Sequence, residues 1–430
     1  MAVPVRRAFC LLAALAVLAA GSVAEEASAA PEPPTPDARA WVLVDASDGE
    51  QLAGRGDTSQ LSIASATKLM TAYVALRELP LKRKIAAPGY QPISPAETLA
   101  GLAPGERMSV SDLLYALLLA SANDAAVTLA DGASGSVPAF VREMNRTAAA
   151  LGLTGTHYEN PIGLDSAANY STASDLATLT RRLRRERIFR EIVDTEHAVL
   201  KTGDHTREIT NRNTLLFEAP WVNGVKTGHT LDAGYVLVGS GTRRGATLVS
   251  AVLGAPGEAA RDAGTLELLE YGFSLYRQET VASSGERIAS PELTYQDSTL
   301  PLVADAGLRV PLRRGQELDV TTSAPEEVEG PIERGQELGE MTVTVDGRDA
   351  GKVSLVAARA ADEATFLEQV NGRLPVPLIL IALGAGVILM GVAAARRGTR
   401  RRRRIAEATT NDEEPMSTPE QERIGQGERP

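Results

Sequence analysis

The sequence has a single cysteine, Cys10, and aromatic residues make up only 4% of its 430 residues. One cysteine excludes a disulfide framework and a thiolate metal cluster within the chain. The shortage of aromatic residues disfavours a base-stacking surface. Basic residues are outnumbered, 44 Lys and Arg against 55 Asp and Glu, and the net charge of −11 disfavours a nucleic-acid binder. The composition is otherwise that of a globular protein, 43% hydrophobic and 23% charged, with enough chain for two or three domains.

The first thirty residues have the pattern of a secretory signal. Arg6 and Arg7 precede an uncharged stretch, 8–20, that is too short to span a bilayer comfortably. Among the small-residue cleavage sites we favour 27–29, because the proline-rich residues 31–37 then begin the mature chain as an extended linker. We therefore expect residues 1–30 to be a signal peptide and the protein to be exported.

A second apolar segment, 374–395, contains 22 residues and no charge. As an α-helix it would be roughly 33 Å long, enough to cross the hydrocarbon core of a membrane. Seven arginines follow within 396–404, a positive-inside signal that places this end in the cytosol. We expect a transmembrane helix in contact with membrane lipid, an extracytoplasmic catalytic part and a basic, disordered cytosolic tail, 396–430. The part from 25 to 395 carries a net charge of −15, so the arginines orient the helix and no nucleic-acid partner is expected.

Strand-like segments lie at both ends of 38–276, and helical patterns fill the middle. Alternating apolar residues predict strands at 41–45, 221–226, 235–240 and 247–252. Apolar residues at helical spacing predict helices at 65–79, 109–129, 137–151, 174–192 and 260–276. This order fits one mixed domain whose sheet is built from both ends of the segment.

From about 277 to 365 the composition changes to β-branched and turn residues. The pentapeptide Arg-Gly-Gln-Glu-Leu occurs at 314–318 and again at 334–338. Turn-centred repetition at this spacing indicates β-hairpins in a small all-β domain. The segment has no histidine and no evident nucleophile, so we interpret it as a structural spacer or interaction module.

Ser65-Ala66-Thr67-Lys68 is the first candidate for chemistry. Positions i and i+3 of a helix share a face, so Lys68 can reach Ser65. A serine hydroxyl is a weak nucleophile until a base takes its proton. A lysine can be that base once burial or a neighbouring cation lowers its pKa. The motif is common, and taken alone it is better explained by an exposed serine at a helix start.

Two further motifs follow along the chain. Ser121-Ala122-Asn123 comes after a leucine-rich run, where a helix end can deliver polar groups into a cleft, although a plain helix C-terminal turn would look the same. Lys226-Thr227-Gly228 follows a strand-like segment. Its glycine allows a substrate chain to approach the strand edge, and its lysine suits a carboxylate. Another Lys-Thr-Gly, at 201–203, lies among charged residues and is interpreted as a turn.

The three motifs, in this order and on these elements, are the signature of the penicillin-recognising serine acyltransferases. The sequence resembles the D-alanyl-D-alanine carboxypeptidases, the low-molecular-mass penicillin-binding proteins, over about 38–276, and 277–365 looks like the second domain of that family. Ala122 stands where glycine is common, and some members use an amphipathic anchor instead of a spanning helix. The segments that carry the resemblance are 64–73, 117–125, 160–164, 171–172, 225–230, 233–235 and 330–333.

The resemblance implies an α+β fold: a penicillin-binding-protein/β-lactamase-like transpeptidase domain, with an antiparallel sheet and a helical cluster, then a small all-β domain and one transmembrane helix. It implies a serine peptidase that removes the terminal D-alanine from peptidoglycan stem peptides ending in D-Ala-D-Ala, through a Ser65 acyl-enzyme. β-Lactams would be inhibitors, and no cofactor would be needed.

The resemblance also assigns roles to the motif residues. Lys68 would take the Ser65 proton, Ser121 would pass a proton to the leaving amine, and Asn123 would hold Lys68 and the substrate amide. The backbone N–H groups of Ser65 and His229 would form the oxyanion hole. The expected substrate-binding residues are Lys226, Thr227, Gly228 and His229.

Other functions remain open on the sequence. A serine β-lactamase shares the three motifs, and one class adds a glutamate between the second and third; Glu159 and Glu191 lie there without a matching context. A D,D-endopeptidase differs only in substrate. A non-catalytic penicillin-binding scaffold would have no chemical need for both the serine and the lysine. The remaining histidines show no metal-ligand spacing, so no metal is expected; they are His157, His197 and His205.

Overall fold

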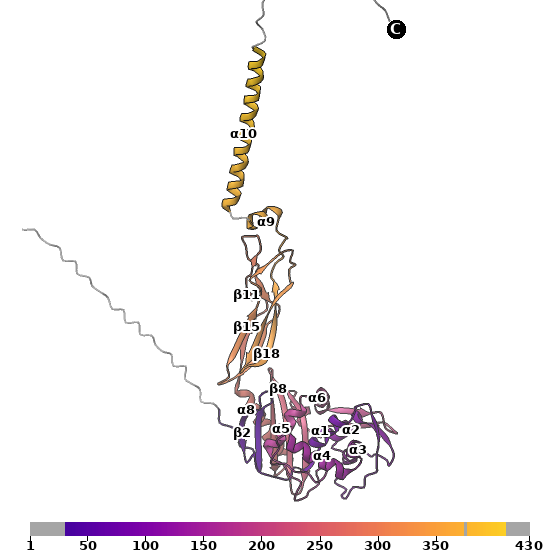
Figure 1. Cartoon of the computed structure of the whole chain (residues 1–430). Helices are drawn as coiled ribbons and strands as arrows, with labels where there is room; N and C mark the ends of the chain where they lie inside the picture. Colours follow the sequence, from indigo (N-terminus) through magenta and orange to yellow (C-terminus); the bar gives the residue numbers. More distant parts are fainter. Residues whose placement is uncertain (1–30, 374–375, 410–430) are drawn as a thin grey trace, which may run out of the picture. The chain divides into compact units, whose positions relative to one another are not determined.

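The computed structural model describes residues 31–373 and 376–409, and they divide into two compact units (Figure 1). The first unit ends at Glu279 and also includes Val310–Gln316. The second consists of Thr280–Arg309 and the chain from Glu317 onward. The expected signal peptide, 1–30, and the last part of the expected tail, 410–430, lie outside the described residues. The change in composition along the sequence predicts a boundary between the two domains at 276/277.

A five-stranded antiparallel sheet in the order β2-β1-β9-β8-β7 forms the centre of the first unit. Alternate residues of β1 point to opposite faces, and both faces are covered. Val42 and Val44 pack into the core of the helical cluster, whereas Trp41 and Leu43 pack against another helix, α8. The strands are β1 (Ala40–Asp45), β2 (Gln51–Arg55), β7 (Val222–Thr230), β8 (Gly234–Arg243) and β9 (Ala246–Ala255).

Helices of the cluster cover one face of this sheet, and α8 (Glu258–Ser274) covers the other together with Leu215 and Leu216. Side chains cap several of them: Ser109, Ser136 and Thr172 each accept a hydrogen bond from the first turn of α2, α4 and α5. The cluster contains α1 (Lys68–Glu78), α2 (Val110–Leu118), α3 (Asn123–Ser134), α4 (Val137–Ala150), α5 (Ala173–Leu183) and α6 (Arg187–Val193). The unit is therefore the mixed domain that the order of elements predicts.

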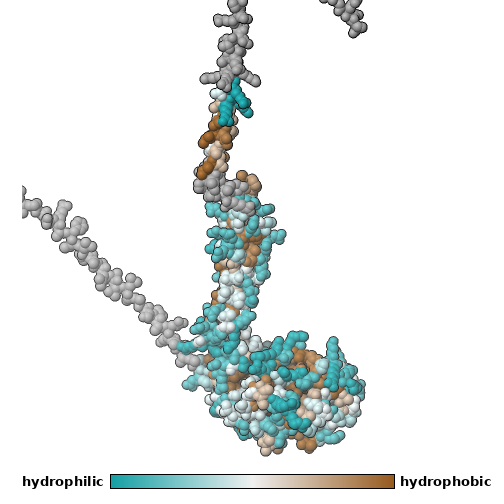
Figure 2. Space-filling model, viewed as in Figure 1, coloured by the Kyte–Doolittle hydropathy of each residue, from teal (hydrophilic) through white to brown (hydrophobic). Residues whose placement is uncertain are grey.

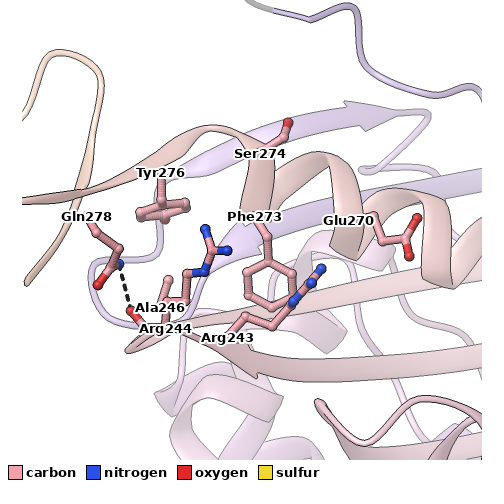
Figure 3. Close-up of a pocket in the computed structure, with 8 residues that line it drawn as sticks. All are labelled: Arg243, Arg244, Ala246, Glu270, Phe273, Ser274, Tyr276 and Gln278. Carbon is pink, nitrogen blue, oxygen red and sulfur yellow. Dashed lines mark hydrogen bonds between the residues drawn. The ribbon is translucent and has the colours of Figure 1, made fainter.

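Short elements complete the first unit. Two hairpins, β3 (Lys84–Ala86) with β4 (Arg107–Ser109) and β5 (His197–Leu200) with β6 (Arg207–Thr210), flank the helical cluster, and α7 (Leu215–Glu218) precedes β7. At the C-terminal end of α8 lies a pocket of about 210 Å³, in which the side chains of Arg243 and Phe273 lie side by side (Figure 3). None of the three sequence motifs lines this pocket.

The second unit is built from strands, as its composition predicts. A five-stranded sheet in the order β11-β13-β18-β17-β15 holds most of its core. Its strands are β11 (Arg287–Ala289), β13 (Leu302–Ala304), β15 (Leu318–Ser323), β17 (Glu337–Val345) and β18 (Arg348–Ala357). Two further pairs are β12 (Glu292–Leu293) with β16 (Glu327–Val328), and β10 (Tyr276–Ala282) with β14 (Leu308–Arg313). The division between the two units falls within β10 and β14.

The repeated pentapeptide forms the same turn twice. In the first copy the Gln316 side chain accepts a hydrogen bond from the backbone N–H of Arg313, 2.9 Å away. In the second copy Gln336 accepts one from Glu333, at 3.1 Å. Each turn contains a glycine with positive φ, +88° at Gly315 and +85° at the second copy. The repeat therefore marks two turns that lead into β15 and β17.

The chain continues through α9 (Phe366–Arg373) into a long helix, α10 (Val376–Thr409). Ile381–Arg400 is apolar enough to cross a membrane, with a mean hydropathy of 1.4 and no buried side chains. In Figure 2 the apolar part of α10 is brown and turns teal where the arginines begin. The helix runs on to Thr409, so the expectation of a disordered tail from 396 is wrong for 396–409. Arginine has a high helix propensity, which permits the continuation.

Candidate active site

The first motif opens a helix. Ser65 lies in a short 3₁₀ turn, η1 (Ala64–Thr67), and Lys68 is the first residue of α1. The Lys68 Nζ lies 2.9 Å from the Ser65 Oγ, as the i, i+3 spacing predicts. It also donates a hydrogen bond to the Ile162 carbonyl oxygen, 2.6 Å away. Because Lys68 is 0% exposed, the amine that would act as base is shielded from water.

Burial lowers the pKa of Lys68 from 10.5 to about 7. The negative charges of Glu97 and Asp124 oppose this shift, and the positive charge of Arg212 adds to it. A substantial fraction of the amine is therefore uncharged at neutral pH. An uncharged amine 2.9 Å from the Ser65 hydroxyl can accept its proton, which is the condition for nucleophilic attack.

A tight turn supplies the carbonyl group that binds Lys68. The Asn160 side-chain oxygen accepts hydrogen bonds from the backbone N–H groups of 162–164, with the shortest at 2.6 Å. The Thr71 hydroxyl of α1 donates to the Pro161 carbonyl oxygen at 2.6 Å. The turn is thus tied to the same helix that carries the lysine. It corresponds to the 160–164 segment that contributed to the resemblance.

Two non-glycine residues at this site have a left-handed backbone. Ala64, directly before the nucleophile, has φ +46°, and Ser121 has φ +61°. Such a conformation costs roughly 1–2 kcal/mol for an L-residue and survives only where the surroundings impose it. One outlier directly precedes the first motif, and the other is the first residue of the second motif.

The second motif interrupts the helix expected at 109–129, and that expectation is wrong over 119–122. Helix α2 ends at Leu118, α3 begins at Asn123, and the left-handed Ser121 lies between them. Ser121 and Asn123 are 4% and 5% exposed. Thr98, in a neighbouring loop, stabilises this break between α2 and α3 with two hydrogen bonds. Its hydroxyl donates to the Ser121 carbonyl oxygen at 2.9 Å, and its carbonyl oxygen accepts from the Asn123 N–H at 2.8 Å.

A carboxylate that the sequence analysis missed adjoins this motif. The Asn123 Nδ2 donates to the Glu97 Oε2 at 2.7 Å, and the Tyr90 hydroxyl donates to the same oxygen. The charge of Glu97 also acts on Lys68. Glu97 therefore contacts the second motif directly and acts on the first through its charge. No spacing rule could have found it, because it precedes Asn123 by 26 residues and belongs to an irregular loop.

The third motif lies on the edge strand β7, beside the nucleophile. A Cβ placed on Gly228 would lie 3.0 Å from the Ser65 nitrogen, so the glycine permits this close approach of strand and turn. Lys226 is 1% exposed and donates to the Thr227 carbonyl oxygen at 2.8 Å. Burial, followed by repulsion from Lys68 and two arginines, holds the pKa of Lys226 well below its usual range.

The imidazole of His229 points away from this chemistry. The residue is exposed, and its ring stacks on Tyr235 with centroids 4.1 Å apart. A contribution to the site therefore falls to its backbone. His157 and His197 bind a backbone carbonyl and a threonine hydroxyl, respectively. Within 31–373 and 376–409, no three His, Cys, Asp or Glu side chains gather as a metal site would require.

The second Lys-Thr-Gly triplet forms a turn between β5 and β6, as its context predicts. The Thr202 hydroxyl donates to Asp112 at 2.7 Å and accepts from the Ser109 N–H at 2.9 Å. The triplet thus fastens a loop to the start of α2. The two glutamates considered for a β-lactamase role are both exposed: Glu159 accepts from Ser166, and Glu191 pairs with Arg187.

Comparison with known proteins agrees with this geometry. The family model for D-alanyl-D-alanine carboxypeptidase matches residues 27–257, and that for the penicillin-binding protein 5 C-terminal domain matches 276–363. The D-alanyl-D-alanine carboxypeptidase DacA of Escherichia coli K12 is 33% identical over 361 residues, covering 79% of this chain and 87% of the relative. DacF of Bacillus subtilis is 28% identical over 348 residues, covering 78% and 90%.

Solved structures show the same fold. Penicillin-binding protein 5 from Haemophilus influenzae has a TM-score of 0.55 and 29% identity, covering 77% of this chain and all of that chain. The Streptomyces K15 DD-transpeptidase has a TM-score of 0.53 and 32% identity, covering 57% of this chain and all of that chain. Fold and motifs together define a penicillin-recognising serine acyltransferase. The chain belongs to the D-alanyl-D-alanine carboxypeptidase family, with the second domain of penicillin-binding protein 5.

Proposed function

We propose that this serine D-alanyl-D-alanine carboxypeptidase of the cell wall acts through Ser65, with Lys68 as its base. The observation that carries the assignment is the 2.9 Å contact between the Ser65 hydroxyl and a fully buried lysine whose pKa is about 7. Lys68 takes the hydroxyl proton while the Ser65 oxygen attacks the carbonyl carbon between the two terminal D-alanines. The tetrahedral oxyanion is bound by the N–H groups of Ser65 and His229.

Collapse of this intermediate breaks the peptide bond and releases D-alanine. Ser121 passes the proton held by Lys68 to the leaving amine, and Asn123 holds Lys68 and the substrate amide. Water then attacks the acyl-enzyme, gives its proton to the base and releases the shortened stem peptide. The base passes this proton to the Ser65 oxygen as the acyl group leaves. The complete cycle therefore restores the starting protonation states of Ser65 and Lys68 and needs no cofactor.

Lys226 and Thr227 bind the terminal carboxylate of the substrate. Lys226 is buried next to another lysine, and the pKa of its amine is lowered accordingly. An incoming carboxylate would restore the charged form, because an opposite charge at close range raises the pKa of an amine. The pair of lysines therefore favours a substrate that ends in a carboxylate. β-Lactams, which carry a carboxylate and a reactive carbonyl, are expected to acylate the same serine.

We also propose that α10 anchors the protein with its catalytic part outside the cytoplasm. Residues 381–395 carry no charge and none of them is buried, which suits contact with membrane lipid. Arg396, Arg397 and 400–404 follow the apolar part and favour a cytosolic C-terminal end. Labelling of single-cysteine variants placed before and after α10, in intact cells, would test this orientation.

Intact mass over time, for the full chain in detergent with benzylpenicillin, tests the catalytic assignment. We expect a long-lived adduct on Ser65 that is absent from Ser65→Ala, and D-alanine release from a pentapeptide. Rapid loss of penicillin without an adduct would instead indicate a β-lactamase. No adduct with penicillin intact would indicate a non-catalytic scaffold. Cleavage of cross-linked dimers in preference to pentapeptide would indicate a D,D-endopeptidase.

A further inference from the structure

We propose that Glu97 is a positioning residue for the acyl-transfer reaction. Its carboxylate fixes the orientation of the Asn123 amide. It thereby fixes the position of the Asn123 carbonyl oxygen, the acceptor for Lys68 and the substrate. This inference rests on the roles proposed above for Asn123 and Lys68. It concerns the loop between β3 and β4, which none of the three motifs includes.

The chemistry of the contact determines which way the Asn123 amide faces. A carboxylate can only accept hydrogen bonds, so the amide group 2.7 Å from the Glu97 Oε2 is the NH₂ donor. The amide is planar, and its carbonyl oxygen therefore points away from Glu97. Without the carboxylate the amide could rotate by half a turn. It would then present a donor to the Lys68 amine, where the reaction needs an acceptor.

The carboxylate of Glu97 is fully used by its hydrogen bonds. Oε2 accepts from Tyr90 and Asn123, and Oε1 accepts from the N–H groups of Ile93 at 2.8 Å and Ser94 at 3.2 Å. Burial raises the pKa of Glu97, but these hydrogen bonds outweigh it and leave the pKa below its usual value. A carboxylate with four donors is a poor general base. Glu97 therefore differs from a glutamate that activates water.

The loop that carries Glu97 is held in place by buried polar groups. Asp124 of α3 accepts from the N–H groups of Ala100 at 2.8 Å and Leu102 at 2.9 Å. Arg207 of β6 donates to the Ala100 carbonyl oxygen at 2.8 Å and pairs with Glu106 at 2.8 Å. A positioning group acts only if its own support is rigid. These contacts meet that requirement.

Glu97→Gln tests the proposal, because it keeps the size of the side chain, replaces one of the two acceptor oxygens by an NH₂ donor and removes the charge. We expect acylation by benzylpenicillin to slow roughly ten- to a hundredfold, the scale of a small misplacement in a reactive site. The charges that act on Lys68 are those of Glu97, Asp124, Arg212 and the neighbouring Lys226. Removal of one negative charge also lowers the pKa of Lys68, so the acid limb of the rate profile should move to lower pH.

The exchange Glu97→Gln with Asn123→Asp provides the rescue. In this double variant the new amide at position 97 can donate to the new carboxylate at position 123. The second oxygen of that carboxylate can accept from Lys68, in the role proposed for Asn123, and the total charge is unchanged. We expect the double variant to recover part of the acylation rate lost in Glu97→Gln. Glu143→Gln, on the outer side of α4, removes a carboxylate elsewhere and should acylate like the unmodified chain. Melting curves of every variant accompany the rates.

Each outcome is decisive. The proposal would be overturned if Glu97→Gln had the same acylation rate and pH profile as the unmodified chain. It would also be overturned if the double variant acylated more slowly than the combined effects of its two single substitutions predict. Normal acylation with an adduct that outlasts that of the unmodified chain would make Glu97 a general base for deacylation and also overturn it. If Glu97→Gln melts early, Tyr90→Phe, which removes one donor to the carboxylate, must slow acylation in the same direction. Failure of the unmodified chain to acylate would refute the proposed function itself.

Discussion

Gly163 lies directly against the backbone that presents the nucleophile. A Cβ on Gly163 would be 1.9 Å from the carbonyl oxygen of Ala64 and 3.0 Å from the nitrogen of Ser65. Gly163 also has φ +88°, a conformation that suits glycine. The turn that binds Lys68 and the strained peptide before Ser65 therefore fit together only because this position has no side chain.

Gly163→Ala should abolish acylation and destabilise the protein. The added methyl group must push the 160–164 turn away from Ala64, which moves the carbonyl bonded to Lys68. We expect a loss of roughly 2–4 kcal/mol, from overpacking and from the left-handed backbone together. The control is Gly152→Ala, because Gly152 has φ +75° with open space around it. Gly152→Ala should lose about 1 kcal/mol of stability and acylate normally. Equal losses of stability in Gly152→Ala and Gly163→Ala would contradict the packing argument.

The acylation rate should follow the protonation of Lys68. The base must be uncharged, and its pKa is about 7, so the rate should fall about tenfold per pH unit below that value and level off above it. Arg212→Gln removes a positive charge that lowers this pKa, so its acid limb should move to higher pH, opposite to that of Glu97→Gln. Rates with benzylpenicillin from about pH 5 to 9 measure both. If the acid limb of Arg212→Gln moved to lower pH instead, the charge of Arg212 would not be lowering the pKa of Lys68.

Local patterns in the sequence were sufficient to predict the motif residues. The Ser65–Lys68 contact follows from a spacing of three on a helical turn, and the edge strand of Lys226 follows from the residues around it. The repeated pentapeptide also predicted its turns, because a glycine and a glutamine at fixed offsets make a local structure. These features depend on neighbours in the chain.

Contacts between distant segments could not be predicted in this way. The Ile162 carbonyl meets Lys68 across 94 residues, and Glu97 meets Asn123 through a loop without periodicity. The sequence suggested a helix end at Ser121, after the leucine-rich run. It could not predict the left-handed backbone of Ser121 or the contacts with Thr98 that hold it. Positions set by tertiary contacts need the fold before they can be identified.

The buried ion pair between Arg207 and Glu106 should stabilise the loop that carries Glu97. Both side chains are nearly inaccessible, 8% and 1% exposed, and their atoms lie 2.8 Å apart. Arg207→Met leaves the carboxylate buried and unpaired, so we expect a loss of about 3–5 kcal/mol at neutral pH, measured by denaturant unfolding. Arg277→Met, in an exposed pair with Glu279, is the control and should cost less than about 1 kcal/mol.

The same pair predicts a dependence on pH. Burial raises the pKa of Glu106, but the hydrogen bonds from Arg207 and from the backbone N–H groups of Ala103 and Asp204, together with the charge of Arg207, outweigh it and bring the pKa to about 2, against 4.5 for an ordinary glutamate. The pair therefore contributes its full stability above about pH 4.5 and loses it as the pH falls towards 2. In Arg207→Met the carboxyl group is easily protonated, so the difference in stability should shrink below about pH 4.5. A difference that stays constant to about pH 3 would show that the pair contributes by packing alone.

The two Lys-Thr-Gly triplets should respond to mutation in opposite ways. Lys226→Ala removes the buried amine proposed to bind the substrate carboxylate, and we expect it to cost about 2–5 kcal/mol of transition-state binding, at least roughly thirtyfold in kcat/KM for D-alanine release. Lys201→Ala removes an exposed side chain from a turn and should leave the rate unchanged. Thr202→Val breaks the hydrogen bonds to Asp112 and Ser109 and should lower stability by about 1–2 kcal/mol, with little effect on kcat/KM at a temperature where the variant is folded. Rates and melts of the three variants separate these roles, because Lys226→Ala should lower the rate and Thr202→Val should lower the melting temperature. A slow Lys201→Ala would place the wrong triplet at the active site.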